Sequence, residues 1–310
     1  MSGADTTTAE VLAGVDLTGR TALVTGASAG LGVETVRALA SVGAHVLMAV
    51  RDEEKGATAA SGIRSAVPGA SLELVVLDLA DLHSVRACAA SVLERHDVLH
   101  LLVNNAGVMA PPLGRTTQDF ELQLGTNHLG HFLLTSLLTP ALLAGAPARV
   151  VNVSSRGHLR SGIDWSDPHY RTRPYDKWQA YGQSKTANIL FTVELERRLG
   201  SQGVHAYSLH PGVIRTELSR HLTEEDMTAM ASRLPAGALT LKDVAAGAAT
   251  TVWAATSPDL EGQGGSYLED CAIAAETPGD GSGGYAPYAV DPDEARRLWE
   301  WSEAEVSAAA

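Results

Sequence analysis

Aromatic residues, cysteines and long apolar runs are all scarce in this chain of 310 residues. Only 5% of the residues are aromatic, so a core built from the 45% that are apolar must consist mainly of Ala, Val and Leu. Cys88 and Cys271 lie far apart and in no metal-like or redox spacing, which argues against a disulfide framework or a zinc site. No apolar run approaches the roughly 20 residues that a membrane-spanning helix needs.

Positive charge is also in short supply. The chain has 23 Lys and Arg against 36 Asp and Glu, a formal net charge of −13. No basic stripe is visible, which argues against a nucleic-acid or anionic-membrane partner. Residues 1–16 are small, polar and acidic, without the basic and apolar regions of a secretory signal. We therefore expect a cytoplasmic protein without a membrane anchor, whose residues 1–17 form a flexible tail.

From residue 18 onward, short β-type runs alternate with helical segments. Predicted strands cover 21–24, 44–50, 72–77, 99–103, 149–153, 204–209 and 265–268. Predicted helices cover 33–42, 53–66, 82–95, 120–143, 181–199 and 241–255, followed by an acidic C-terminal helix from about 293. Such alternation is typical of βαβ units. We predict a single α/β domain over 18–310, a Rossmann-type doubly wound fold with a parallel sheet of about seven strands and helices on both faces, extended at its C-terminus by about 271–310.

Glycines follow the first predicted strand in the pattern Gly26-x3-Gly30-x-Gly32. Alone, this pattern is as consistent with an ordinary glycine-rich turn as with a cofactor-binding loop. Its strand–loop–helix–strand context favours a dinucleotide-binding loop, in which glycines let the backbone approach a pyrophosphate at a helix N-terminus.

Arg51 ends the second predicted strand, about twenty residues beyond Gly32. An acidic residue in this region suits a ribose 2′-hydroxyl, whereas an Arg suits a 2′-phosphate. Arg51 therefore favours NADP(H) over NAD(H). NAD(H) remains an alternative, because Asp52, one position later, could reach the ribose. Arg51 could instead pair with Asp52 or Glu54 on the surface.

Tyr181 and Lys185 are four residues apart in a predicted helix, so they share one helix face. A nearby ammonium lowers the pKa of a phenol, which makes the phenol usable as a proton donor and acceptor. An isolated Tyr-x3-Lys pattern usually lies on an amphipathic helix without a functional role, so its significance depends on the rest of the chain.

Several short motifs occur in a fixed order: Thr25-Gly26-x3-Gly30-x-Gly32, Asn104-Asn105-Ala106-Gly107, Asn127, Ser155, Tyr181-x3-Lys185 and Pro211-Gly212-x-Ile214-x-Thr216. On these motifs, residues 18–270 resemble the short-chain dehydrogenase/reductase superfamily. The stretches 125–132, 183–188, 209–213 and 270–271 are similar to the branch that contains retinol dehydrogenases and the WW-domain-containing oxidoreductase.

The resemblance implies that four residues are catalytic. Tyr181 would exchange a proton with the substrate oxygen, and Lys185 would lower the pKa of Tyr181 and bind the nicotinamide ribose. Ser155, preferred to Ser154 because it is second in its pair, would stabilise the oxyanion. Asn127 would hold a water that links Lys185 to solvent.

The resemblance also implies a cofactor-binding set. Its members are Gly26, Ser28, Gly30, Leu31, Gly32, Arg51, Asp78, Leu79, Asn105, Ala106, Gly107, Tyr181, Lys185, Pro211, Gly212, Ile214 and Thr216. No metal site is expected, because His128 and His131 have no obvious third ligand.

These features predict an NADP(H)-dependent oxidoreductase that interconverts a lipophilic alcohol and its ketone or aldehyde. An NAD-dependent alcohol dehydrogenase and a non-catalytic NADP(H)-binding redox sensor are the alternatives. The segment 217–235 is the predicted lid, and the long stretch 156–180 is expected to contribute to the substrate wall. A homodimer or homotetramer is possible, since family members often associate through the helices at 120–143 and 181–199.

Overall fold

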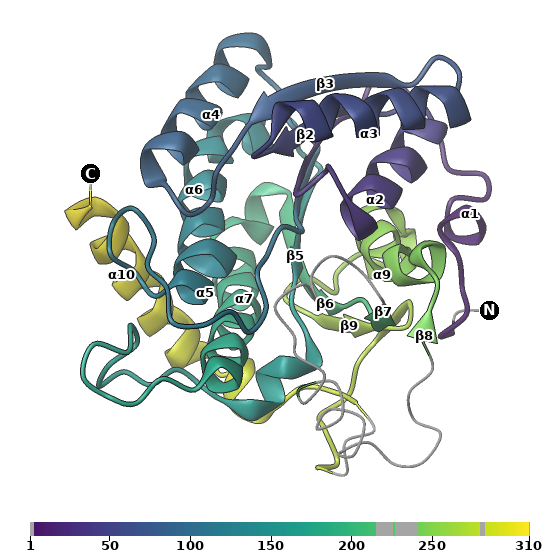
Figure 1. Ribbon diagram of the computed structural model, residues 1–310. Coiled ribbons are helices and arrows are strands. Elements are labelled where there is room, and N and C mark those ends of the chain that lie inside the picture. The colour runs from purple at the N-terminus through teal and green to yellow at the C-terminus, as the bar shows by residue number, and fades with distance from the viewer. Residues whose placement is uncertain (1–2, 215–225, 227–240, 280–282, 310) are drawn as a thin grey trace.

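The computed structural model describes residues 3–214, 226, 241–279 and 283–309. Its centre is an eight-stranded sheet in the order β10-β9-β6-β5-β4-β1-β2-β3 (Figure 1). The strands are β1 (Thr21–Thr25), β2 (His45–Val50), β3 (Ser71–Val76), β4 (Leu101–Asn104), β5 (Ala148–Val153), β6 (Val204–His210), β9 (Tyr267–Glu269) and β10 (Ala272–Ile273). All pairs are parallel except β10 with β9. The doubly wound α/β fold is confirmed.

The sheet has one strand more than the seven predicted. The additional strand, β10, is only two residues long and is joined to β9 by a tight turn at Asp270 and Cys271, both at positive φ. So short a strand carries no periodic signal in the sequence. A separate parallel pair, β7 (Val213–Ile214) and β8 (Leu241–Lys242), lies beside the main sheet.

Helices cover both faces of the sheet (Figure 1). One face packs against α2 (Gly30–Ser41), α3 (Glu53–Ala66) and α9 (Val244–Thr256), and the other against α4 (Leu82–Arg95), α6 (Gly130–Ala144) and α7 (Lys177–Leu199). Short helices complete the chain: α5 (Leu122–Leu124), η1 (Gly125–Leu129), η2 (Arg156–Arg160), η3 (Gly200–Gln202), η5 (Pro258–Leu260) and η6 (Pro287–Ala289). Each face therefore has its own apolar core.

The N-terminal segment is more ordered than predicted. Thr7 caps the short helix α1 (Thr8–Val11) in a reciprocal capping box with Glu10. Leu12 is buried and packs with Ala38 of α2 and Val252 of α9. Burial of Leu12 thus anchors residues 7–12 to α2 and α9, a contact that the polar composition of this segment does not indicate.

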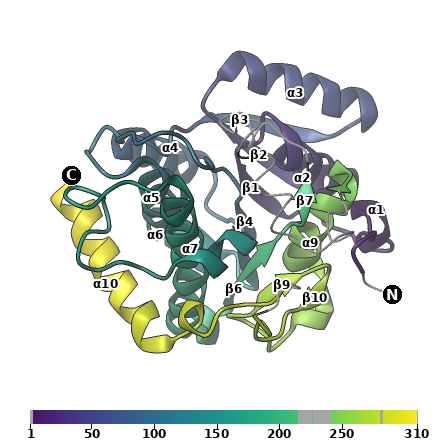
Figure 2. The same cartoon turned by 60° about the horizontal axis from the view of Figure 1, so that its bottom comes forward.

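The C-terminal helix α10 (Pro292–Ala308) packs on α7, on the side of the molecule away from the N-terminus (Figure 2). Trp299 of this helix lies edge-on to Phe132 of α6, with ring centroids 5.0 Å apart, and 5.7 Å from Phe191 of α7. In the described part of the chain no helix is long and apolar enough to cross a membrane. The lid predicted at 217–235 lies, apart from residue 226, outside the described residues.

Candidate active site

The glycine loop joins β1 to the N-terminus of α2. Gly26 and Gly30 have positive φ, and a Cβ on Gly32 would lie 2.2 Å from the carbonyl oxygen of Gly26. The N-cap residue of α2 is Ala29, whose side chain cannot hydrogen-bond the first N–H groups of the helix. The first backbone N–H groups of this helix are therefore left for an anion, as the sequence predicts.

Thr25, at the end of β1, fixes the loop that follows β4. Its hydroxyl accepts hydrogen bonds from the backbone N–H groups of Asn105 and Ala106, both 2.9 Å away. The Asn105 side-chain amide donates to the Thr25 carbonyl at 2.8 Å. The buried ends of β1 and β4 are thus held in register beside the glycine loop.

His131 of α6 extends this network towards Asn127. Its Nδ1 lies 3.0 Å from the Asn127 carbonyl, which can only accept, so Nδ1 carries the proton. Burial lowers the pKa of His131 to about 4, so the ring is neutral and its Nε2 accepts from the Thr25 hydroxyl at 2.9 Å. One imidazole therefore connects the glycine-loop strand to the helix that carries Asn127.

Asn127 is buried in η1, a single π-helical turn between α5 and α6. Its Oδ1 accepts from Val108 N at 2.8 Å, and its Nδ2 donates to Val108 O at 3.0 Å and to Ser184 Oγ at 2.9 Å. A Cβ on Gly107 would lie 3.1 Å from this Oδ1 and 3.6 Å from Lys185 Nζ. Asn127, Gly107 and Lys185 thus converge, and the π-turn is a feature common at functional sites.

The two serines at the end of β5 point in different directions. Ser154 Oγ donates to the Lys185 carbonyl at 2.8 Å and so faces the α7 backbone. Ser155 caps η2 by accepting from Gly157 N at 3.0 Å, and its hydroxyl interacts with the Tyr181 phenol. This arrangement supports the preference for Ser155.

Tyr181 and Lys185 share a buried face of α7, as the spacing predicts. Lys185 Nζ lies 5.7 Å from the Tyr181 ring centroid and donates to Val153 O at 2.9 Å. Burial lowers the pKa of Lys185 to about 8. Burial raises the pKa of Tyr181 to about 12, and the Ser155 hydroxyl offsets part of that rise.

The expected lowering of the phenol pKa is therefore not present in this structure. The prediction weighed the ammonium charge but not the desolvation of both groups, which is the larger effect here. The Lys185 ammonium, with a pKa of about 8, is still mainly protonated at pH 7.

The end of β6 approaches the glycine loop through α9. Pro211 and Gly212 follow β6, with Gly212 at a φ of +98°. Ile214 of β7 and Leu31 of α2 both contact Gly247, where a Cβ would lie 2.5 Å and 2.9 Å from their side chains. Thr216 lies outside the described residues.

Arg51 is exposed at the end of β2, and no hydrogen bond or ion pair of its side chain occurs within the described residues. Asp52 is committed elsewhere, because its carboxylate accepts from Lys55 N at 3.1 Å and caps α3. Asp52 therefore competes poorly for a ribose hydroxyl. At the end of β3, Asp78 accepts from Ala80 N at 2.9 Å, and Leu79 packs against Gly130 of α6.

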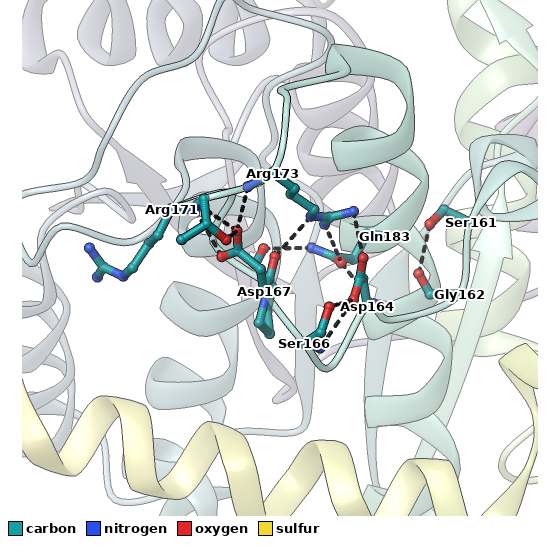
Figure 3. Close-up of polar contacts among 10 residues, drawn as sticks. Ser161, Gly162, Asp164, Ser166, Asp167, Arg171, Arg173 and Gln183 are labelled. Carbon is teal, nitrogen blue, oxygen red and sulfur yellow. Dashed lines mark hydrogen bonds and ion pairs between the residues drawn. The ribbon is translucent and has the colours of Figure 1, made fainter.

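The stretch from Ser155 to Tyr181 divides into two parts. In the first part, η2 contacts Tyr181: a Cβ on Gly157 would lie 2.7 Å from the Tyr181 ring. In the second part, the Gln183 side chain holds the loop 161–173 (Figure 3). It accepts a hydrogen bond from Asp164 N at 3.0 Å and donates one to Pro168 O at 2.8 Å.

The side chain of Asp167 organises this loop, accepting from the backbone N–H groups of Arg171, Thr172 and Arg173. Gln183 lies two residues after Tyr181, about 200° round the helix. The loop 161–173 therefore packs on the other side of α7 from Tyr181, and its expected contribution to the substrate wall stays a prediction.

His158 of η2 connects the backbone at Ser155 to the C-terminal segment. Its Nδ1 donates to Ser155 O at 2.6 Å, and its Nε2 accepts from Ala286 N at 3.2 Å. Tyr288 donates its hydroxyl proton to the His158 carbonyl at 2.7 Å. Burial lowers the pKa of His158 to about 4, which keeps the ring neutral, and the two backbone partners of the ring fix this tautomer.

These features bring the glycine loop, Asn127, Ser155, Tyr181 and Lys185 to the carboxyl ends of the parallel strands, where doubly wound sheets bind ligands. The family model for the short chain dehydrogenases matches residues 20–227. The chain belongs to the short-chain dehydrogenase family. Members of this family are oxidoreductases that act on CH–OH and carbonyl groups.

Individual relatives agree with this assignment. Human retinol dehydrogenase 13 is 42% identical over 282 residues, which cover 91% of this chain and 82% of that protein. A crystal structure of an uncharacterized protein from Mycobacterium paratuberculosis has a TM-score of 0.74 and 36% identity, with 98% of both chains covered. A gluconate 5-dehydrogenase from Burkholderia cenocepacia, in complex with NADP and tartrate, has a TM-score of 0.65 and 26% identity, covering 82% of this chain and 94% of that one. The resemblance to the retinol dehydrogenase branch is confirmed.

The sequence named Thr25 only as part of the glycine motif, and it assigned no role at this short-chain dehydrogenase site to Thr25, His131 or His158. Thr25, His131 and His158 touch no reacting group but position the residues that would. His131 is in the Gly125–Phe132 stretch that resembles the retinol dehydrogenase branch, which was the one available signal for it. His128, the other member of the supposed metal pair, bonds Ser302 Oγ at 2.7 Å.

Proposed function

We propose that this short-chain dehydrogenase uses NADP(H) to interconvert a lipophilic alcohol and its ketone or aldehyde, with Tyr181 as general acid and base. The observation that carries the proposal is the buried Tyr181 phenol, which has the Ser155 hydroxyl beside it and Lys185 Nζ 5.7 Å from its ring centroid. This set stands next to a helix N-terminus that no side chain caps.

The residues present fit a dinucleotide. Gly26 and Gly32 leave no space for a Cβ, so the backbone turns tightly at the place where the pyrophosphate would bind. Arg51 suits a 2′-phosphate, and the engagement of Asp52 in the α3 cap favours NADP(H) over NAD(H). The NADP bound to the related gluconate 5-dehydrogenase is in keeping with this choice.

When bound, the nicotinamide supplies or accepts the hydride. In the direction of reduction, Tyr181 donates its phenolic proton to the carbonyl oxygen, and in oxidation it takes the proton from the alcohol. The Ser155 hydroxyl donates a hydrogen bond to the developing oxyanion. Lys185 supplies a positive charge beside the phenol, which favours the phenolate at the moment when the proton leaves.

Asn127 has a positioning role in this proposal. Its side chain is already bonded to Val108 and Ser184, so it holds the Val108 backbone next to Lys185. The water relay that the family resemblance implies for Asn127 stays a prediction. The lipophilic substrate is supported by the relative that is named for retinol, a hydrophobic alcohol.

The experiment is NADPH oxidation with a panel of lipophilic aldehydes and ketones, and with a sugar-acid ketone as the polar counterpart. Tyr181→Phe should lower kcat by about 10²–10⁴-fold, the usual contribution of a general acid. It should leave NADPH binding, followed by fluorescence, nearly unchanged.

Tyr170→Phe is the matched control, because it removes a buried phenolic hydroxyl in the stretch 156–180 that has no hydrogen-bond partner among the described residues. Its kcat should equal that of the wild type. Unchanged turnover in Tyr181→Phe would refute the mechanism. Tight NADPH binding without turnover of any carbonyl compound would instead favour the redox sensor.

A further inference from the structure

Three potential metal ligands meet at the end of the sheet opposite to the candidate active site. His45 is the first residue of β2, Glu73 lies in β3, and His96 is the C-cap of α4. One donor atom from each lies within 4.8 Å of the other two. These residues come from three separate elements, so no local spacing in the sequence predicts that they lie together.

The distances match those between the ligands of one tetrahedral ion. Ligands about 2.0–2.1 Å from a zinc ion lie about 3.4 Å from one another. Glu73 Oε2 lies 3.1 Å from His96 Nε2 and 3.6 Å from His45 Nε2. The two imidazole centroids are 5.5 Å apart, close to the roughly 5.2 Å expected of two rings on a tetrahedral ion.

Two neighbours orient these ligands. Ser71 Oγ lies 2.7 Å from His45 Nδ1, so the other ring nitrogen can direct its lone pair at Glu73. Arg95 bonds the second carboxylate oxygen, Oε1, which leaves Oε2 for the two histidines. Partners of this kind fix the tautomer and direction of metal ligands in known sites.

We propose that His45, Glu73 and His96 bind one zinc ion, with the fourth position open to water. Two imidazoles and one carboxylate are a donor set that zinc prefers. The side chains are 31%, 25% and 18% exposed, so an ion can enter from solvent. The ion would replace the proton now shared by His96 Nε2 and Glu73, and it would join the edge strand β3 to β2 and α4.

Zinc binding to the untagged full-length protein, stripped with EDTA and dialysed, tests the proposal. Calorimetry with ZnCl2 should give one ion per chain. At a free zinc concentration a hundredfold above the Kd, Tm should rise by roughly 5 °C.

The variants should form a graded series. Ser71→Ala removes only an orienting partner and should weaken zinc binding about tenfold. His45→Gln and His96→Gln each remove a ligand and should weaken it by more than that. Both side chains are partly exposed, so these variants keep the fold, as circular dichroism can verify.

His205→Gln is the matched control. It removes a histidine that bonds a glutamate, Glu196, at 3.0 Å with no third ligand in the described part of the chain, so zinc affinity should not change. Failure of the wild type to bind zinc at about 100 μM, or equal affinity in His96→Gln and the wild type, would overturn the proposal. The site is remote from Tyr181, so neither outcome bears on the proposed NADP(H) activity.

Discussion

Thr25→Val is the substitution that most directly tests the buried network behind the glycine loop. Valine has nearly the same shape as threonine but lacks the hydroxyl. That hydroxyl accepts from the N–H groups of Asn105 and Ala106 and donates to His131 Nε2. The substitution therefore leaves two partly buried donors and one buried acceptor, His131 Nε2, without their partner.

The expected loss of stability follows from these three groups. Each buried polar group left without a partner costs about 1–3 kcal/mol, and some relaxation will occur, so the free energy of unfolding should fall by about 3–5 kcal/mol. Thr25→Ser keeps the hydroxyl and deletes only a methyl group, which should cost about 1 kcal/mol. The Asn105–Gly107 loop should also shift, which weakens NADPH binding in the valine variant alone.

Urea unfolding at pH 7.5, with fluorescence as the probe, measures both variants against the wild type. If Thr25→Val and Thr25→Ser differ by less than about 0.5 kcal/mol, the hydroxyl does not organise this region and the reasoning is refuted. The pair also separates packing from hydrogen bonding, because only the serine variant leaves a small cavity.

Further predictions concern the cofactor, the catalytic loop and acid stability. Arg51→Asp should weaken NADPH binding at least about tenfold while sparing NADH, because it removes charge-assisted bonds to a phosphate; equal losses for both cofactors would contradict our interpretation of Arg51. Gly157→Ala should reduce kcat but not NADPH affinity, because its Cβ would lie 2.7 Å from the Tyr181 ring; unaltered kcat would show that the ring moves freely. Burial holds several histidines neutral in the folded chain, whereas in the unfolded chain they bind protons below pH 6.5. The free energy of unfolding therefore falls as the pH falls, with a slope of up to about 5 kcal/mol per pH unit. The pKa values behind this prediction are about 3 for His128 and His210 and about 4 for His131 and His158. Urea titrations from pH 7.5 to pH 5 measure the slope, and a stability that does not change with pH would contradict the prediction.

The sequence was sufficient for features whose signal is local. The strand–helix alternation, the glycine loop and the Tyr181–Lys185 pair each depend on residues a few positions apart, and the structure places them as expected. Ser155 was preferred to Ser154 on the family resemblance, because it is the second serine of its pair.

Features that depend on distant contacts could not be predicted. Thr25 and His131 meet across 106 positions, and neither carries a pattern that indicates the other. The pKa of Tyr181 was misjudged because burial is a property of the whole fold, whereas the Tyr–Lys spacing shows only the charges. Leu12 and β10 were missed because a single apolar residue or a two-residue strand is too short to show periodicity.

The link between His158 and the C-terminal segment has a consequence for the order of folding. Ala286 is 128 positions from His158, and Tyr288 is 130. Contacts so far apart in the chain form slowly, because a long loop must close before they contribute. We therefore expect a nascent chain that has already formed β1 to β6 to hold Ser155 loosely until Ala286 and Tyr288 have left the ribosome.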